Sequence, residues 1–319
     1  MHAAVVTSFD SPPMFKDFPK PSASRESELL VDVLATALHP RVVSQANGSH
    51  YTSTDELPLV PGIDGVGRDA NGMLHYFLLP DTAMGSMSEQ TVIDVRRSIV
   101  LPEGTDPVAV AAAMNPAMSS WVALRQRVNF ALGQNVLVLG ATGNAGALAV
   151  QIAKRFGANK IIAAGRDQTK LAGLKQLGAT ETVLLDGTPE DIAERLGTAS
   201  VDVDVVIDYL WGETTTAAMI ALVTHRDDDS RPLTWIEIGS VTGPTAEIPS
   251  AALRACRLSI VGSGQGSVSA REFLAELPEL ALQISGGAFQ VDTVEVPLRE
   301  VEAAWADSQT TAKRIVLVP

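Results

Sequence analysis

The spacing of hydrophobic positions changes near residue 106, and the two regions on either side predict different kinds of elements. Before residue 106, apolar runs interrupted by prolines and glycines predict β-strands at residues 3–9, 28–38 and 73–79. Residues 10–27 contain four prolines and several charged side chains, which predicts a surface loop. Residues 58–67 read PLVPGIDGVG, and this density of glycine predicts a segment that packs its backbone closely against another element.

From residue 106 onward, strand-like and helix-like runs alternate. Alanine-rich helices are expected at residues 108–114 and 119–128. Beyond them the pattern predicts strands at residues 136–139, 160–164, 182–185, 203–207, 234–238 and 258–262, with helices at 169–177, 189–196 and 214–223. The final part predicts a helix at 270–284, a strand at 291–296, a helix at 298–308 and a strand at 314–318. Such alternation is typical of a parallel sheet covered on both faces, so the expected fold class is α/β.

A glycine turn, GATGNAG at residues 140–146, follows the expected strand 136–139 and precedes a run in which Leu148, Ile152 and Phe156 recur every four residues. A strand, a glycine turn and a helix in this order can bind a pyrophosphate. Small residues let the backbone approach the ligand, and the first amides of the helix point at its negative charge. The alternative is an ordinary tight turn, since a glycine pattern alone is weak. The residues assigned to nucleotide binding here are Gly140, Thr142, Gly143, Asn144, Ala145 and Gly146.

The end of the second expected strand, with Gly165 and Arg166, indicates which dinucleotide is bound. An acidic residue at this place binds the 2′-hydroxyl of NAD, whereas glycine and arginine leave room and charge for the 2′-phosphate of NADP. Arg166 can donate two parallel hydrogen bonds to a phosphate, and Lys170 adds a second cation one helical turn later. Asp167 could serve as the acid or as the N-cap of the next helix. We favour NADP(H) as the cofactor.

Composition and charge narrow the class of protein. The chain of 319 residues has 46% hydrophobic and 19% charged residues, an ordinary composition for a soluble protein. A net charge of −13 argues against nucleic acid or an anionic membrane as partner and leaves a small-molecule substrate. Cys256 is the only cysteine, which excludes an internal disulfide and fits a reducing cytoplasm. The first residues show no export signal, so a cytoplasmic location is expected.

Three motifs carry a family resemblance. PGIDGVG at residues 61–67 is similar to PG-x-E-G-x-G, GSMSEQTV at 85–92 to G-x-[FY]-A-E-[YF]-V, and GATGNAG at 140–146 to GAAGGVG. With them, the chain resembles the medium-chain dehydrogenase/reductase superfamily, and within it the zinc-free quinone-oxidoreductase branch. The resemblance implies a GroES-like, β-rich catalytic domain at residues 1–116 and 265–319. It also implies a doubly wound Rossmann domain at 117–264, with the active site in the cleft between the two domains.

The chain departs from the zinc enzymes of this superfamily. The positions of their three catalytic ligands, Cys, His and Cys, hold His39, Ile63 and Asn115 here, and the four cysteines of their structural zinc are absent. Isoleucine cannot bind zinc, so we expect no metal site. Without a Lewis acid, oxidation of an unactivated alcohol is poorly supported. Hydride addition to a quinone or an α,β-unsaturated carbonyl still needs only orientation, an oxyanion donor and a proton source.

The expected substrate residues also differ from the zinc-free branch. Where that branch has N-P-x-D, residues 39–42 read HPRV, and a tyrosine often found two positions later is Ser44. The candidate catalytic residues are His39, Ser44 and Tyr51. His39 could donate a proton or bind a substrate oxygen, or it could simply pair with a neighbouring backbone group. Tyr51 has a surface loop as its alternative, and Asp64 is interpreted as a structural carboxylate.

On the cofactor side, the resemblance places Ser119 near the phosphates or the nicotinamide. Gly239 and Ser240 end the strand at 234–238, at the edge of the sheet where ligands bind, although a simple turn is an equal alternative. Relatives often pair the edge strands of two cofactor domains, which implies a homodimer.

The leading hypothesis is a zinc-independent NADPH-dependent oxidoreductase that transfers hydride to a quinone, an enone or alkenal, or a similar activated carbonyl. The alternative is an NADP(H)-binding protein with little or no turnover that senses redox state or binds a partner. Loss of the usual substrate residues of the branch motivates this second hypothesis.

Overall fold

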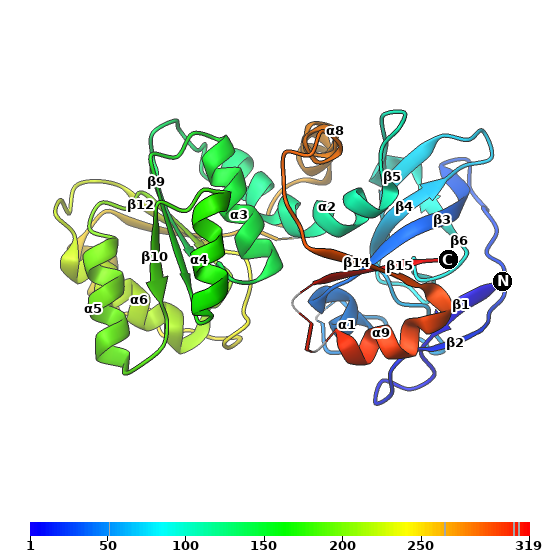
Figure 1. Ribbon diagram of the computed structural model, residues 1–319, viewed down its shortest axis with the longest axis horizontal. Helices are drawn as coiled ribbons and strands as arrows, with labels where there is room; N and C mark the ends of the chain where they lie inside the picture. The colour runs from blue at the N-terminus through cyan, green and yellow to red at the C-terminus, as the bar shows by residue number, and fades with distance from the viewer. Residues whose placement is uncertain (51, 265, 309, 312) are drawn as a thin grey trace. The chain divides into compact units, whose positions relative to one another are not determined.

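The computed structural model describes residues 1–50, 52–264, 266–308, 310–311 and 313–319 (Figure 1). The chain forms two compact units. The terminal unit contains Met1–Asn115 and Leu274–Pro319, and the central unit contains Pro116–Phe273. Each unit has its own sheet and its own hydrophobic core.

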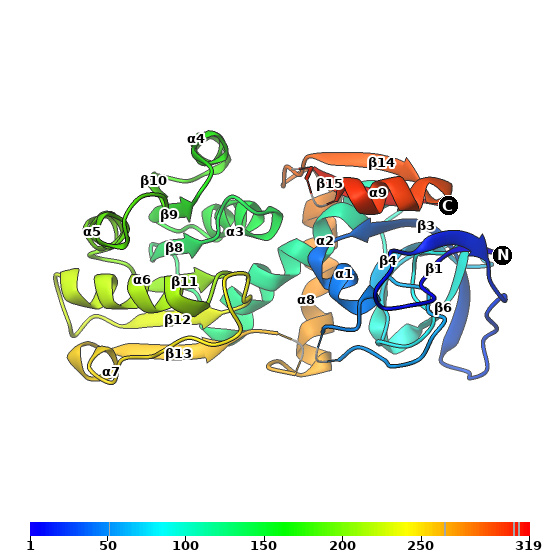
Figure 2. The same cartoon turned by 90° about the horizontal axis from the view of Figure 1, so that it is seen from below.

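The central unit is built on a six-stranded parallel sheet in the order β10-β9-β8-β11-β12-β13, which Figure 2 shows as a stack. Its strands are β8 (Asn135–Leu139), β9 (Lys160–Gly165), β10 (Glu181–Leu184), β11 (Val205–Asp208), β12 (Leu233–Glu237) and β13 (Leu258–Gly262). The chain leaves β8 in one direction and returns to its other side at β11. This is the doubly wound order of dinucleotide-binding folds, so the α/β prediction is confirmed.

Helices cover both faces of this sheet. They are α3 (Asn144–Arg155), α4 (Gln168–Leu177), α5 (Pro189–Ala199), α6 (Gly212–His225) and the short α7 (Ala252–Ala255). Helices α3 and α4 lie on one face and α5 and α6 on the other (Figure 1). Because both faces are covered, β8 and β11 are buried along their whole length, which explains the apolar runs at residues 136–139 and 205–207 within them.

The terminal unit contains a mostly antiparallel sheet in the order β14-β15-β3-β4-β5-β7, with β6 also paired to β3, and a separate β1–β2 hairpin. The strands are β1 (His2–Val5), β2 (Met14–Asp17), β3 (Glu28–Leu38), β4 (Asp64–Arg68), β5 (Leu74–Leu78), β6 (Gln90–Asp94), β7 (Ser98–Val100), β14 (Thr293–Pro297) and β15 (Arg314–Val318). The helices are α1 (Pro40–Ala46), α8 (Ala270–Ser285), which begins in the central unit, and α9 (Val301–Asp307), with 3₁₀ turns η1 (Val95–Arg97) and η3 (Leu298–Glu300).

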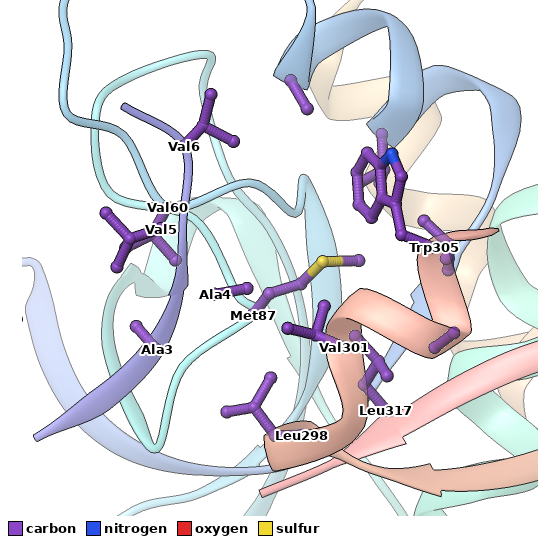
Figure 3. Close-up of a cluster of buried hydrophobic side chains, with 14 of the residues drawn as sticks. Ala3, Ala4, Val5, Val6, Val60, Met87, Leu298, Val301, Trp305 and Leu317 are labelled. Carbon is purple, nitrogen blue, oxygen red and sulfur yellow. The ribbon is translucent and has the colours of Figure 1, made fainter. Parts of the chain in front are cut away.

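The core of the terminal unit joins the two ends of the chain. Figure 3 shows side chains from β1 and the residues after it packed with Met87 and with Val301 and Trp305 of α9. Leu317 of the last strand, β15, belongs to the same cluster. The C-terminal segment therefore completes a hydrophobic core that the first residues begin.

Two sequence predictions are wrong. Residues 10–27 were expected to be a loop, but they contain β2, which pairs with β1 from His2↔Asp17 to Val5↔Met14. This strand is half exposed and lacks alternating apolar residues, so backbone pairing rather than burial defines it. The helices expected at 108–114 and 119–128 are one helix, α2 (Pro107–Val122), which continues as a π-helical turn, η2 (Ala123–Arg127). Pro116 lies inside α2, where burial of the helix offsets the hydrogen bond that proline removes.

The helix Pro107–Arg127 is also long and apolar enough to cross a membrane by length and composition. Its most apolar window is 72% buried inside the structure, as in an ordinary core helix. Its length and composition are therefore weak support for a membrane span.

The glycine-rich segment at residues 58–67 packs its backbone closely against neighbouring elements, as predicted. A Cβ on Gly62 would lie 2.3 Å from Ser86 Oγ, and Gly62 has a φ of +113°. A Cβ on Gly67 would lie 2.8 Å from a methyl group of Val31. The glycines here serve close packing within the terminal unit.

Candidate functional site

The turn after β8 presents free backbone amides at the carboxyl edge of the central sheet. Gly140 has a φ of +83°, which turns the chain sharply out of the strand. The first backbone hydrogen bond of α3 runs from the Ala147 amide to the Gly143 carbonyl at 2.8 Å. Within the described residues, the amides of Asn144, Ala145 and Gly146 have no carbonyl partner. Three unpaired amides at a helix N-terminus form an anion-binding arrangement.

The three glycines of the turn have different physical roles. Gly140 supplies the positive φ, and Gly146 allows close packing, because a Cβ there would lie 2.3 Å from the Gly140 carbonyl oxygen. Gly143 has an ordinary φ of −82°, and the nearest atom to an added Cβ would be 3.6 Å away. The fold itself therefore does not require glycine at 143. A missing side chain in front of three free amides fits the approach of a pyrophosphate, and the residues present fit a dinucleotide.

The end of β9 carries the residues predicted to select the nucleotide. Arg166 and the Lys170 side chain are exposed and form no ion pair within the described part of the chain. Asp167 is the N-cap of α4, and its carboxylate accepts a hydrogen bond from the Lys170 amide at 3.0 Å. The N-cap interpretation of Asp167 is confirmed, and the two cations remain free for an anion.

Gly165 has a structural explanation that the sequence did not show. A Cβ on Gly165 would lie 2.6 Å from Thr142 Cγ2 and 2.8 Å from Thr142 Oγ1. The Thr142 side chain therefore lies against the end of β9, and glycine is needed there to accommodate it. The structure thus brings the glycine turn and the end of the second strand together.

The loop after β11 faces the same turn, at the point where strand order reverses. A Cβ on Gly140 would lie 3.1 Å from Leu210 Cδ2 and 3.3 Å from Tyr209 Cβ. Trp211 has φ 56° and ψ −165°, a backbone conformation that is strained for any residue except glycine. Ligands of doubly wound sheets bind in the crevice at this reversal point. Sequence analysis did not assign these three residues, although their place at the end of a parallel strand was a usable signal.

A buried carboxylate anchors that loop. Asp208, fully buried at the end of β11, accepts hydrogen bonds from the Leu210 amide at 2.8 Å and from Trp235 Nε1 at 2.9 Å. The Thr215 hydroxyl donates a further bond at 2.5 Å. Glu237 pairs with Asp208 in register on the neighbouring strand, β12. Burial raises the pKa of Glu237, and the charge of Asp208 raises it further.

Ser119 contacts this loop through a side chain. Its hydroxyl donates to the Pro116 carbonyl at 2.7 Å and lies 2.9 Å from the Tyr209 hydroxyl. Burial raises the pKa of Tyr209 to about 12, although hydrogen bonds with Ser119 and Ser120 act in the opposite direction. Ser119 therefore reaches the carboxyl edge of the sheet as part of a neutral hydroxyl pair.

Gly239 and Ser240 follow β12 at the same edge. A Cβ on Gly239 would lie 3.3 Å from the Tyr209 carbonyl oxygen, so this glycine packs against the loop after β11. Ser240 is exposed and has no side-chain hydrogen bond within the described residues.

In the terminal unit, His39 forms a buried polar cluster with Asp64. His39 precedes α1, and its Nε2 lies 3.1 Å from Asp64 Oδ1. The other carboxylate oxygen accepts a hydrogen bond from the Tyr76 hydroxyl at 2.9 Å. Burial lowers the pKa of His39, and the charges of Arg314 and Arg41 add to this effect, while Asp64 opposes it. The cluster therefore favours a neutral imidazole.

Arg314 and Tyr76 belong to this cluster, and sequence analysis did not find them. Arg314 is buried at the start of β15, and its Nη1 donates to the Leu38 carbonyl at 3.2 Å. Burial lowers the pKa of Arg314 to about 10, against the opposing charge of Asp64. Burial raises the pKa of Tyr76 well above its ordinary value, and Asp64 adds to that. In the sequence they stand only as members of the apolar runs that form β15 and β5, and such runs do not indicate their partners.

The other two catalytic candidates are Ser44 and Tyr51, and the structure describes only the first of them. The Ser44 hydroxyl donates to the Arg41 carbonyl at 2.9 Å within α1, so its hydrogen atom is engaged in the helix. Tyr51 lies outside the described residues. Nearby, the Arg41 guanidinium pairs with the Asp81 carboxylate and donates to the Thr52 hydroxyl at 2.8 Å.

The positions that hold zinc in the related enzymes do not form a ligand set. Ile63 is buried in the apolar core of the terminal unit, and Asn115 lies within α2. Within the described residues, no group of three or more His, Cys, Asp or Glu side chains is placed to hold a metal ion.

Comparisons with known proteins agree with this geometry. A family model described as zinc-binding dehydrogenase matches residues 145–281. The probable NADPH-dependent quinone reductase tdiC of Emericella nidulans is 31% identical over 361 aligned positions, which cover 100% of both chains. The 2-methylene-furan-3-one reductase of Solanum lycopersicum is 30% identical over 187 positions, covering 53% of this chain and 47% of the relative.

Solved structures show the same fold. The quinone oxidoreductase of Thermus thermophilus, also solved in complex with NADPH, has a TM-score of 0.82 and 24% identity, with 100% of both chains covered. A mycobacterial quinone oxidoreductase has a TM-score of 0.84 and 21% identity, also over 100% of both chains. Three findings identify the family: a relative that matches over the full length of both chains, the doubly wound central sheet and the glycine turn. The chain belongs to the medium-chain dehydrogenase/reductase superfamily, among the quinone oxidoreductase-like proteins.

Proposed function

We propose that this protein is a zinc-independent NADPH-dependent oxidoreductase that transfers hydride to a quinone, an enone or alkenal, or a similar activated carbonyl. One observation carries the proposal: three unpaired amides directly follow a glycine, Gly143, that the fold does not require. The names of the relatives support the reaction, since one is a probable NADPH-dependent quinone reductase and another is an NADPH-dependent alkenal/one oxidoreductase.

In this proposal the cofactor lies along the carboxyl edge of the central sheet. The amides of Asn144, Ala145 and Gly146 hold the pyrophosphate, with Gly140, Thr142 and Gly143 forming the turn beneath it. Arg166 and Lys170 bind the 2′-phosphate beyond Gly165. Ser119, Gly239 and Ser240 lie toward the other half of the dinucleotide.

The reaction needs a substrate that is already electron-poor. When bound, NADPH supplies a hydride from its nicotinamide ring. A sequence with one cysteine and with Ile63 at a ligand position cannot build the zinc ligand set of the related alcohol dehydrogenases. The protein's own contribution is then to orient the substrate, to exclude water and to bind the oxygen on which charge develops. His39 is the residue proposed to contact the substrate, with Ser44 and Tyr51 as the other candidates.

The proposal is tested by NADPH oxidation over a panel of quinones, enones and alkenals, with NADH in parallel. We expect turnover with NADPH and a clear preference for it over NADH. Calorimetric titration with NADPH separates the two hypotheses. Tight NADPH binding with no oxidation of any compound in the panel would favour a redox-sensing or partner-binding protein, and absence of NADPH binding would refute both.

We also propose that the protein is a cytoplasmic homodimer and that it has no membrane or nucleic-acid partner. The last strand of the central sheet, β13, lies at its edge and is only partly buried, so its backbone is available to a second copy of the chain. Light scattering after size-exclusion chromatography measures the mass directly, and a monomer at micromolar concentration would contradict this part.

A further inference from the structure

Two histidines of the terminal unit are paired with carboxylates in the same way, and in both rings Nδ1 has no partner within the described residues. His39 and His75 are each 4% exposed, and each places Nε2 against an aspartate, at 3.1 Å from Asp64 and 3.2 Å from Asp69. The Nδ1 of His75 is buried and has no hydrogen-bond partner. The Nδ1 of His39 also has no hydrogen-bond partner within the described residues. It is therefore an unpartnered polar atom on a side chain that is more than nine-tenths buried.

The surroundings of Asp64 determine which nitrogen of His39 carries the proton. The Asp64 carboxylate receives the Tyr76 hydroxyl on one oxygen and faces the charge of Arg314. A carboxylate can only accept hydrogen bonds. The His39 Nε2 must therefore be the donor in the 3.1 Å contact with Asp64.

A single proton remains on this imidazole. Burial and the nearby guanidinium groups of Arg314 and Arg41 lower the pKa of His39, so the neutral ring is favoured despite Asp64. With its one hydrogen directed at Asp64, the ring presents an unshared electron pair at Nδ1. The N-cap position often uses a side chain to accept a helix amide, but His39 forms no such bond. Nδ1 is thus an oriented hydrogen-bond acceptor with no partner in the described chain.

We propose that His39 Nδ1 accepts a hydrogen bond from a hydroxyl group of the substrate, so that the site selects activated carbonyl compounds that carry a neutral alcohol or phenol. Asp64 and Tyr76 are positioning residues that hold the ring in the Nε2–H form. This inference rests on the proposed function and adds a substrate class to it. It also assigns His39 as an acceptor rather than as a proton donor.

Two substitutions test the roles of Nδ1 and Nε2 of His39 separately. His39→Asn places an amide oxygen where Nδ1 lies and loses the contact with Asp64. His39→Gln reaches Asp64 with its amide NH₂ and leaves no group at the Nδ1 position. Both variants keep the central unit intact, so their NADPH affinity is expected to equal that of the wild type.

Three matched quinones provide the measurement: 2-hydroxymethyl-, 2-methoxymethyl- and 2-ethyl-1,4-benzoquinone. The wild type should favour the hydroxymethyl compound over the other two by about 2- to 10-fold in kcat/KM, the size of one neutral hydrogen bond. His39→Asn should keep this preference, and His39→Gln should lose it. Equal preference in the wild type and in His39→Gln, or no preference in the wild type, would overturn the proposal.

A spectroscopic measurement tests the tautomer without turnover. In ¹⁵N-histidine-labelled protein, His39 should show a protonated Nε2 and an unprotonated Nδ1, and the Nδ1 signal should move when 2-hydroxymethyl-1,4-hydroquinone is added. A protonated Nδ1 would refute the assignment. Failure of the proposed function gives a different result, since all three quinones would then leave NADPH unoxidised while the tautomer could still be read.

Discussion

The substitutions Gly143→Ala and Gly146→Ala separate ligand binding from folding within one turn. Both add one methyl group, three residues apart, next to the same strand. At Gly146 the new Cβ would lie 2.3 Å from the Gly140 carbonyl oxygen and 2.6 Å from Ala141 Cα. At Gly143 the nearest atom is 3.6 Å away, an ordinary contact, and the φ of −82° suits any residue.

The magnitudes follow from these distances. Both atoms near Gly146 belong to the backbone and cannot rotate away, so Gly146→Ala should cost about 3 kcal/mol, the upper part of the range for overpacking. That corresponds to a fall of about 6–12 °C in Tm for a unit of this size. Gly143→Ala loses a favourable N-cap residue but restricts the unfolded chain, so its Tm should stay within about 3 °C. Its methyl group is added at the N-cap that precedes the free amides, so it should weaken NADPH binding at least tenfold, roughly the value of one charge-assisted hydrogen bond.

Differential scanning calorimetry of both variants, with and without NADPH, and titration of NADPH fluorescence measure the two effects. Wild type and Gly146→Ala should be stabilised by saturating NADPH, whereas Gly143→Ala should require a much higher concentration. The reasoning is refuted if Gly143→Ala binds NADPH like the wild type, or if it lowers the Tm as much as Gly146→Ala does.

Three further predictions concern single side chains. Arg166→Ala should weaken NADPH binding about 10- to 100-fold and leave NADH binding and Tm unchanged, because Arg166 is exposed and unpaired in the described chain; equal effects on both nucleotides in fluorescence titrations would contradict this. Tyr76→Phe should lower the free energy of unfolding, measured in urea, by about 1–3 kcal/mol, because it leaves an oxygen of buried Asp64 without its 2.9 Å hydrogen-bond donor. An unchanged midpoint of urea unfolding would count against that hydrogen bond. The pKa of Tyr209, raised to about 12, means that the folded state keeps this proton longer than the unfolded chain. Its contribution to stability is therefore complete below the unfolded pKa of about 10 and is lost as pH rises toward 12. Absorbance titration of Tyr209→Phe against wild type should remove a tyrosinate transition near pH 12, and a transition near pH 10 would refute the burial argument.

Several features followed from the sequence because their physical causes are local. Strand-like and helix-like runs that alternate along the chain predicted the parallel sheet of the central unit. The structure confirms one of these strands, β13, at Leu258–Gly262 as expected. The glycine turn was identifiable because a positive φ at Gly140 and close packing at Gly146 are demands of neighbouring backbone. The N-cap role of Asp167 likewise depends on residues three positions apart.

Other features depend on which distant segments meet, and a periodic pattern does not contain that information. Strand β2 (Met14–Asp17) exists because β1 offers its backbone, although its own side chains lack alternation. His39 was a candidate from its position alone, with proton donor, substrate ligand and structural residue all open. Asp64, 25 residues later, and Arg314, beside the Leu38 carbonyl across 276 positions, decide its charge and its tautomer. The sequence by itself determined the parallel sheet and its glycine turn, through short-range backbone geometry. Only the tertiary structure decided which nitrogen of His39 is free, because burial and charge act through space rather than along the chain.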